Sequence, residues 1–427
     1  MFLLYDIFFI IFALLYLPYL LIEGKWHRGF IIRFGFWPPE LKERLKGKRN
    51  IWFHAVSVGE ILAVQSLIKR VRENYPDFQL VISTVTETGF NLAQTKFPTD
   101  VVLFAPLDFS IVVHNYVRWI KPEIYINAET EIWPNLLACL KRRRIPAILV
   151  NGRISEKSFV NYEKVKFLLK NIFDSIYTFC MQGQEDAKRI IDLGAPPEKV
   201  KVFGNMKFDE VPLEKHFTLT ELGFEKNSQI LLAGSTHPGE EEVLFDIFNS
   251  ISAEFPKLRL MIAPRHIERT QEIVDLLKAK GLEPILWTQI KDARLRKDSV
   301  VVVDTIGDLR SLYPLATLVF IGKSLKGYGG QNMIEPACFG RAIIVGPNMQ
   351  NFKDIFEYFV KAKAVMQVRD EVMLLTIIRR LLHDEREREE LGIMAKQVIA
   401  GHKGATTATL NMITDILSGR REKVLQR

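Results

Sequence analysis

The chain is poor in cysteine: 427 residues contain only Cys139, Cys180 and Cys338. The three are far apart, odd in number and include no Cys-x-x-Cys pair, so neither a disulfide framework nor a cysteine zinc site is indicated. Low-complexity segments are also absent, and 48% of the residues are hydrophobic. The composition therefore predicts a folded protein of a reducing compartment.

Several catalytic signatures are missing from the sequence as well. There is no Gly-x-x-x-x-Gly-Lys-Ser/Thr loop, which argues against a P-loop nucleotidase, and no Gly-x-Ser-x-Gly nucleophile elbow. Neither an Asp-x-Asp pair nor a His-Glu-x-x-His motif occurs. A metal-bridged sugar-diphosphate site and a zinc site are therefore not indicated, and we expect no metal and no cofactor.

Residues 2–22 are almost wholly apolar and carry one charge, Asp6. At about 1.5 Å per residue, a helix over this segment would reach roughly 31 Å, the thickness of a bilayer's hydrocarbon core. We predict a membrane anchor over residues 1–22, either spanning the bilayer or lying in its interface. A buried core helix is the alternative.

The net charge of +8 is concentrated after this segment. Residues 23–50 hold eight basic residues against three acidic ones. Because the basic stretch directly follows the apolar one, we expect anionic membrane lipids as partners, and no nucleic acid. The same order of residues places the body of the protein in the cytoplasm.

Apolar runs alternate with amphipathic helical patterns, such as 60–74 and 184–193, along the rest of the chain. This alternation predicts parallel sheets covered by helices on both faces. The strands expected in the first half are 51–55, 79–84, 101–105, 123–127, 146–150, 176–180 and 200–203. Those expected in the second half are 229–233, 258–263, 284–287, 299–303, 317–321, 342–345 and 364–368. The polar segment 209–228 is the predicted linker.

Residues 51–71 and 230–251 follow one plan: an apolar strand, a polar loop ending in Gly-Glu, and an amphipathic helix. In a parallel sheet such loops lie at the carboxyl edge, where helix amides favour anions. The pair predicts two doubly wound Rossmann-like domains facing a central cleft, over residues 23–210 and 211–405. A C-terminal helix over 406–427 completes the chain. A cleft of this kind suits a two-substrate transfer enzyme.

Candidates for chemistry in the first half follow predicted strands. Glu60 begins a helix, where the amides should keep its carboxylate ionised as a general base; a favourable first-turn charge is the alternative. Glu129 and Glu131 follow another strand, and Arg153 closes a further one. Lys207 precedes the linker. For Glu131 and Lys207 the alternative is ordinary surface charge.

In the second half, four strand ends carry polar or glycine-rich segments. Ser235 and Thr236 precede a helix and would bind a phosphate or merely cap the helix. Arg265 and His266 close the next strand. The other two segments are 302–309 and 321–336. Four such segments at one edge of a sheet favour a nucleotide site.

In their order, these segments resemble the Kdo transferases, which attach 3-deoxy-D-manno-octulosonic acid (Kdo) to lipid A precursors in Gram-negative bacteria. The resemblance covers nearly the whole chain. It rests on the apolar N-terminus and on HAVSVGE (54–60), ETEIWPN (129–135), GNMKFD (204–209), STHPGEE (235–241), PRHIER (264–269), IGDL (306–309) and GGQNMIEP (329–336).

The resemblance implies an inverting GT-B glycosyltransferase of lipopolysaccharide biosynthesis on the cytoplasmic face of the inner membrane. CMP-Kdo would be its donor and a lipid A precursor (lipid IVA) its acceptor. It implies that Glu60 is the proton acceptor, while Glu129 and Lys207 support the transition state. The implied CMP-binding residues are Pro264, Arg265, Ile306, Gly307, Asp308, Asn332, Met333, Ile334 and Glu335. Further candidates for phosphate or sugar contacts are Ser235, Thr236, His266 and Arg153.

Two other functions stay open from the residues themselves. One is another GT-B enzyme, such as a lipid-linked GlcNAc transferase with a UDP-sugar donor. The other is a non-catalytic, nucleotide-binding membrane adaptor. The donor that is consumed distinguishes the first, and the turnover of a Glu60→Ala variant distinguishes the second.

Overall fold

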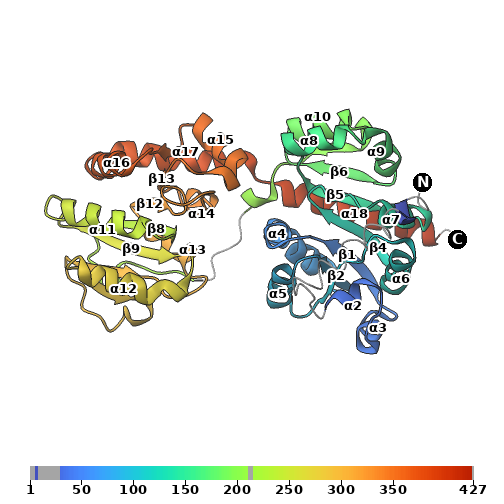
Figure 1. Cartoon of the computed structure of the whole chain (residues 1–427), viewed down its shortest axis with the longest axis horizontal. Coiled ribbons are helices and arrows are strands. Elements are labelled where there is room, and N and C mark those ends of the chain that lie inside the picture. Colours follow the sequence, from blue (N-terminus) through green and yellow to red (C-terminus); the bar gives the residue numbers. More distant parts are fainter. Residues whose placement is uncertain (1–4, 8–28, 210–214, 426–427) are drawn as a thin grey trace. The chain divides into compact units, whose positions relative to one another are not determined.

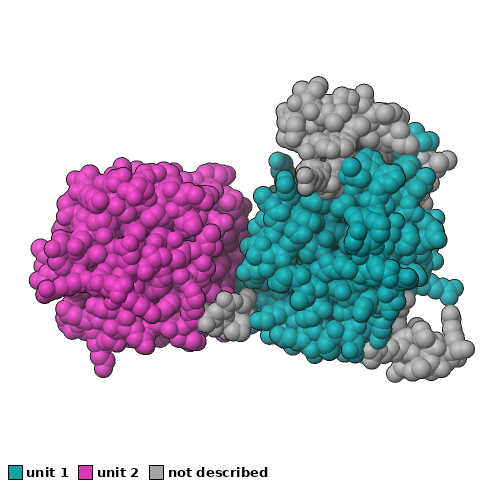
Figure 2. Space-filling model, turned by 90° about the horizontal axis from the view of Figure 1, so that it is seen from below, with its two compact units in different colours: residues 1–209, 402–427 teal, residues 210–401 magenta. Residues whose placement is uncertain are grey.

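The computed structural model describes residues 5–7, 29–209 and 215–425 (Figure 1). The chain forms two compact units, each built around one parallel sheet. Unit 1 comprises residues 1–209 and 402–427, and unit 2 comprises residues 210–401 (Figure 2).

The sheet of unit 1 has seven parallel strands in the order β3-β2-β1-β4-β5-β6-β7. Its central strand β1 pairs with β2 on one side and β4 on the other, so that Ile51 lies between Leu80 and Ile124. The strands are β1 (Arg49–His54), β2 (Phe78–Thr84), β3 (Val101–Phe104), β4 (Pro122–Ala128), β5 (Ala147–Gly152), β6 (Thr178–Met181) and β7 (Val200–Val202).

Helices cover both faces of this sheet, which explains why the middle residues of its central strands are mostly apolar and buried. Residues of α4, α5 and α18 join one buried cluster, and residues of α6, α7, α9 and α10 join the other. The helices are α2 (Gly29–Arg33), α3 (Pro39–Leu45), α4 (Val58–Asn74), α5 (Glu87–Lys96), α6 (Ser110–Ile120), α7 (Pro134–Arg142), α8 (Glu156–Glu163), α9 (Lys166–Phe173), α10 (Gln184–Asp192) and α18 (Ala405–Leu425).

The sheet of unit 2 also has seven parallel strands, in the order β10-β11-β9-β8-β12-β13-β14. Its strands are β8 (Gln229–Thr236), β9 (Leu258–Pro264), β10 (Glu283–Leu286), β11 (Ser299–Val302), β12 (Leu318–Ile321), β13 (Ala342–Val345) and β14 (Met366–Gln367). The helices are α11 (Glu240–Ile251), α12 (Thr270–Ala279), α13 (Leu309–Leu312), α14 (Ile334–Cys338), α15 (Lys353–Lys361), α16 (Glu371–His383) and α17 (Glu385–His402). Apolar residues of α11, α12 and α16 share one core with the strands.

The C-terminal helix α18 packs against α4 in unit 1. Tyr75 donates to Thr414 at 2.9 Å, linking the end of α4 to α18. Asp209, where the chain leaves unit 1, accepts hydrogen bonds from the amides of Gly404 and Thr406, at 2.7 and 2.6 Å. These bonds hold the outgoing and the returning chain together.

All the predicted strands are confirmed, although the strand expected over 364–368 is only Met366–Gln367 because it pairs with β13 alone at the sheet's edge. The expectation of a linker as far as residue 228 is wrong. Leu222 and Phe224 are buried, so this part of the polar segment belongs to unit 2.

Of the predicted anchor, only residues 5–7 are among those described; the other residues of the 1–22 segment lie outside them. Asp6, the one charge in the apolar segment, accepts hydrogen bonds from Asn135 Nδ2 at 2.7 Å and from the amide of Ser110 at 3.1 Å. Its carboxylate is therefore satisfied by unit 1. None of the helices described here has the length and apolar character needed to cross a membrane.

Candidate functional site

Glu60 lies in the first turn of α4, after the N-cap residue Ser57. Its side chain is buried, and Oε2 accepts a hydrogen bond of 2.6 Å from the amide of Val56. The hydroxyl of Ser57 lies 3.4 Å from Oε1. The helix start thus fixes the carboxylate at the carboxyl edge of the sheet, directly after β1.

Burial raises the pKa of Glu60 to about 7, against the opposing effect of the Val56 amide. The charges of Glu129 and Glu131 contribute to this raised pKa. The expectation that the helix start keeps this carboxylate firmly ionised is therefore wrong, because the amides do not replace the water lost on burial. A carboxyl group that titrates near neutral pH is well matched to accept a proton there.

Glu129 and Glu131 follow β4, which is the neighbour of β1 in the sheet. Glu129 adopts a left-handed backbone conformation with φ of 53°. Burial, and then the charge of Glu129, raises the pKa of Glu131. The structure thus brings three carboxyl groups, one from the β1 loop and two from the β4 loop, within electrostatic reach of one another.

Lys207 lies in a 3-10 turn (η2, Met206–Phe208) that packs against α4, the helix that carries Glu60. Buried Met206 and Phe208 hold the turn in place, and the side chain of Asn205 caps it at the amide of Lys207. Lys207 itself is half-buried. Its position is therefore set by the same core as that of Glu60.

Arg153 is exposed at the end of β5, and its main chain exchanges hydrogen bonds with Thr130 Oγ1. These bonds tie the end of β5 to the loop that carries Glu129. His54, in contrast, is a core residue: Nδ1 lies 2.9 Å from Ser83 Oγ, and burial lowers its pKa to about 4. It is therefore neutral at pH 7.

In unit 2 the predicted nucleotide segments follow β8, β9, β11 and β12, which stand next to one another in the sheet. The Arg265 amide donates to the Thr236 carbonyl at 3.0 Å, and the Gly322 amide donates to the Gly234 carbonyl at 2.8 Å. Arg265 and His266 are exposed, whereas Thr236 is buried. The structure therefore brings all four segments to one edge.

Glu240, at the first position of α11, holds two of these segments together. Its buried carboxylate accepts hydrogen bonds from the amides of His237 and of residues 323–326, at 2.7–3.5 Å. This role is not evident from the sequence alone. The one available signal was that Gly239-Glu240 repeats the Gly59-Glu60 pair.

Asp308 is also fully engaged. Its carboxylate accepts from Lys215 Nζ at 2.6 Å, from Thr305 Oγ1 at 2.6 Å and from Trp287 Nε1 at 3.1 Å. Burial raises the pKa of Asp308, but these three donors outweigh it and hold the pKa below its usual value. The carboxylate thus orders the loop in which Ile306 is 85% exposed and Gly307 has a φ of 97°.

The glycine-rich segment ends in a turn closed by Asn332, whose Oδ1 accepts from the amide of Ile334 at 3.0 Å. Asn332 Nδ2 donates to Glu335, whose pKa is raised by burial. The side chains of Met333 and Ile334 are buried, as is Pro264. Of the predicted CMP-binding residues, these three could therefore contact a ligand mainly through their main chains.

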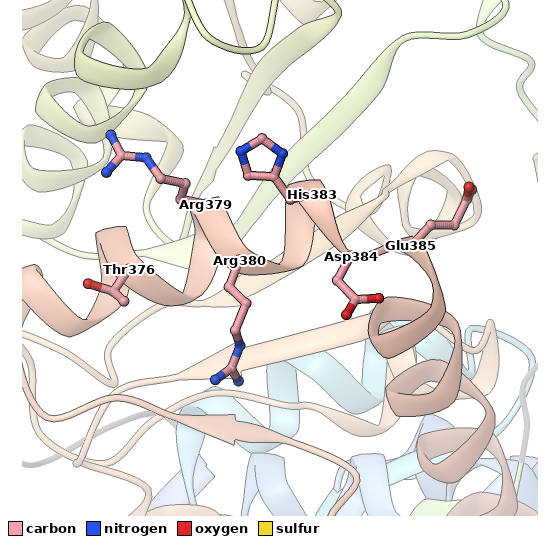
Figure 3. A pocket seen from close by; sticks show the side chains of 6 residues that line it. All are labelled: Thr376, Arg379, Arg380, His383, Asp384 and Glu385. Carbon is pink, nitrogen blue, oxygen red and sulfur yellow. The ribbon is translucent and has the colours of Figure 1, made fainter.

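A surface cavity of about 580 Å³ lies elsewhere in unit 2, at the junction of α16 and α17. Its basic residues are paired: Arg379 and His383, which point to the same side in Figure 3, both contact Glu254, and Arg380 contacts Glu387. No predicted site residue lines it. The residues around it are Thr376, Arg379, Arg380, His383, Asp384 and Glu385.

Comparison with known proteins decides the family. Residues 29–210 match the family model described as 3-deoxy-D-manno-octulosonic-acid transferase (kdotransferase). The chain is 31% identical over 375 residues to the 3-deoxy-D-manno-octulosonic acid transferase of Haemophilus influenzae, covering 86% of this chain and 87% of that one. The chain belongs to the Kdo transferase family. It is an enzyme, a glycosyltransferase.

Another Kdo transferase, from Chlamydophila psittaci, is 32% identical over 397 residues, or 90% of this chain and 89% of that relative. Among solved structures, UDP-GlcNAc 2-epimerase from Neisseria meningitidis bound to UDP-GlcNAc has a TM-score of 0.56 at 10% identity, covering 86% of this chain and 100% of the epimerase. That likeness concerns the fold alone, and it agrees with a GT-B type of architecture for this Kdo transferase.

Proposed function

We propose that this enzyme transfers Kdo from CMP-Kdo to a lipid A precursor, with inversion at the anomeric carbon. The observation that carries the proposal is the extended identity with Kdo transferases, 31% over 86% of the chain. The presence of a buried carboxyl group, Glu60, with a pKa of about 7 supports the chemistry.

In this mechanism Glu60 takes the proton of the acceptor hydroxyl as its oxygen attacks the anomeric carbon. The bond from that carbon to the phosphate oxygen breaks in the same step, and CMP leaves with the bonding electrons. Lys207 and Arg265 would offset the negative charge that develops on the phosphate. Glu129 would stabilise the positive charge on the sugar ring.

The residues proposed to bind CMP lie at the end of β9 and in the segments after β9, β11 and β12 of unit 2. Asp308 orders the segment after β11, and Glu240 holds the start of the segment after β12. Exposed Ile306 is available to the base, and Glu335 to the ribose hydroxyls. Ser235, Thr236, His266 and Arg153 remain candidates for phosphate or sugar contacts. The donor has a single phosphate, so we propose that transfer needs no metal ion to bridge a diphosphate.

We also propose that residues 1–22 attach the enzyme to the cytoplasmic face of the inner membrane, where the amphiphilic acceptor resides. Deleting this segment should release the protein from membranes washed with high salt, or leave only a weak association. A truncated protein that stays fully bound after the wash would remove the anchor from the proposal.

The test of function is incubation of the full chain with CMP-Kdo and tetraacylated lipid A precursor, with the product read by mass. The mass also counts the Kdo units added, and NMR of the new linkage reports inversion or retention. UDP-GlcNAc is the matched alternative donor. Transfer of GlcNAc, or no transfer of Kdo under any condition, would overturn the proposal.

A further inference from the structure

The segment between β5 and β6 has an unusual surface. A right-handed crossover needs one helix to return the chain to the start of the next strand, but here two short helices, α8 and α9, follow one another (Figure 1). No side chain of α8 is fully buried. The rings of Phe159 and Tyr162 in this helix are half-buried and pack against the core of unit 1.

Apolar side chains face the solvent around the α8–α9 turn. Phe167 is 75% exposed and Val160 is 50% exposed. Val165 and Leu168 are 38% and 37% exposed. Four exposed apolar side chains within residues 160–168 favour an interaction surface over isolated surface residues.

Basic side chains surround this apolar group. Lys157, Lys164, Lys166 and Lys170 are all exposed, against two exposed acids in the same stretch, Glu156 and Glu163. A helix that lies in a membrane interface has this composition. Its apolar residues enter the boundary of the acyl chains, and the lysines around them pair with lipid phosphates. An excess of lysines matches an anionic bilayer and disfavours a basic protein partner.

The surface also adjoins the candidate site. The α8 helix begins after β5 at the carboxyl edge of the sheet, where Arg153 is tied to Thr130 beside Glu129. Tyr162 of α8 interacts electrostatically with Glu131. A membrane held at α8 and α9 would therefore lie next to the carboxyl groups on which acceptor activation depends.

We propose that α8 and α9 form an interfacial docking surface that inserts Phe167 and its apolar neighbours into an anionic lipid bilayer. The docking serves the proposed function, on which its purpose rests, because it would bring a lipid-borne hydroxyl to Glu60. The occupant is the bilayer, not a protein.

The test is a local probe in the full chain. The described cysteines, Cys139, Cys180 and Cys338, are buried, so a thiol-reactive NBD dye should label a Phe167→Cys variant selectively. On vesicles containing phosphatidylglycerol, its emission should shift to the blue and intensify, and nitroxide-labelled lipids should quench it. A matched control is Val372→Cys, a residue of unit 2 that is 74% exposed and should show none of these changes.

Replacing Lys164 and Lys166 with glutamine should weaken binding to these vesicles by about fivefold per lysine, and pure phosphatidylcholine should bind still less. An unchanged NBD emission at position 167, or an equal change at position 372, overturns the proposal. A blue shift of the NBD emission that a protein partner causes in the absence of lipid overturns it as well. None of these readings requires CMP-Kdo or an acceptor, so they are distinct from a failure of Kdo transfer.

Discussion

The amide of Val56 is a hydrogen-bond donor to Glu60 at 2.6 Å, and the hydroxyl of Ser57, 3.4 Å away, is the other hydrogen-bond partner of this carboxyl group among the residues that the structure describes. Glu240, which occupies the corresponding place after Gly239, has its two oxygens occupied by amides from two loops. The same Gly-Glu helix start therefore serves two purposes. In unit 2 the carboxylate of Glu240 joins two loops. In unit 1 the carboxylate of Glu60 can still accept a proton.

The first prediction concerns the pH dependence of turnover. Because Glu60 must be deprotonated to act as a base and its pKa is about 7, kcat/KM should rise with pH and level off above that value. Glu131→Gln removes a negative charge that raises this pKa, so the rising limb should move to lower pH. If the rising limb of the wild-type pH profile were centred near 4.5, the ordinary pKa of glutamate, the assignment of Glu60 as the base would be contradicted.

Glu60→Gln should separate activity from stability. Turnover should fall by roughly 10²–10⁴, the usual span for a general base, while CMP binding is retained. The folded pKa lies above the unfolded one, so the native state binds more protons and loses stability as pH rises from about 4.5 to about 7. The variant should therefore be more stable than the wild type at pH 8, by about 1–3 kcal/mol, and not at pH 4.

Denaturant unfolding at the two pH values measures this difference. Glu73→Gln, on the exposed side of the same helix, is the control and should change neither activity nor stability. Equal stability of the Glu60→Gln variant and the wild type at pH 8 would mean that burial of Glu60 costs nothing.

Glu240→Ala should damage unit 2. The change leaves the amides of His237 and of the 323–326 loop without their acceptor, at a cost of about 3–5 kcal/mol in the free energy of unfolding. CMP binding should weaken with it. Glu242→Ala, an exposed neighbour in the same helical turn, is the matched control. Similar melting temperatures for the two variants would refute the prediction.

The Lys215–Asp308 pair should act on the donor and not on the chemical step. Lys215→Gln removes one of three donors to Asp308, so the KM for CMP-Kdo should rise about two- to fivefold with kcat nearly constant. In a double-mutant cycle, the change should have little further effect once Asp308 is asparagine. Fully additive effects would show that the two residues act independently.

The strands could be predicted because their apolar runs are buried from both sides, as with Ile51 in β1. The position of Glu60 in the first turn of α4 could also be predicted, because helix-start chemistry is local. The role of Glu240 in joining two loops could not, since its partners in the 323–326 loop are more than eighty residues away in sequence. The pKa of Glu60 could not either, because it depends on burial that only the folded chain creates.

The return of the chain at α18 has a consequence for biosynthesis. The ribosome makes the sheet of unit 1 first, yet the apolar flank of α4 that receives Ile413 and Leu417 stays uncovered until α18 emerges. During that interval the nascent enzyme exposes this apolar surface while the whole of unit 2 is synthesised. Unit 1, whose sheet is translated first, therefore completes its core only after unit 2 has been made, and a stop codon before residue 405 would leave the apolar flank of α4 uncovered.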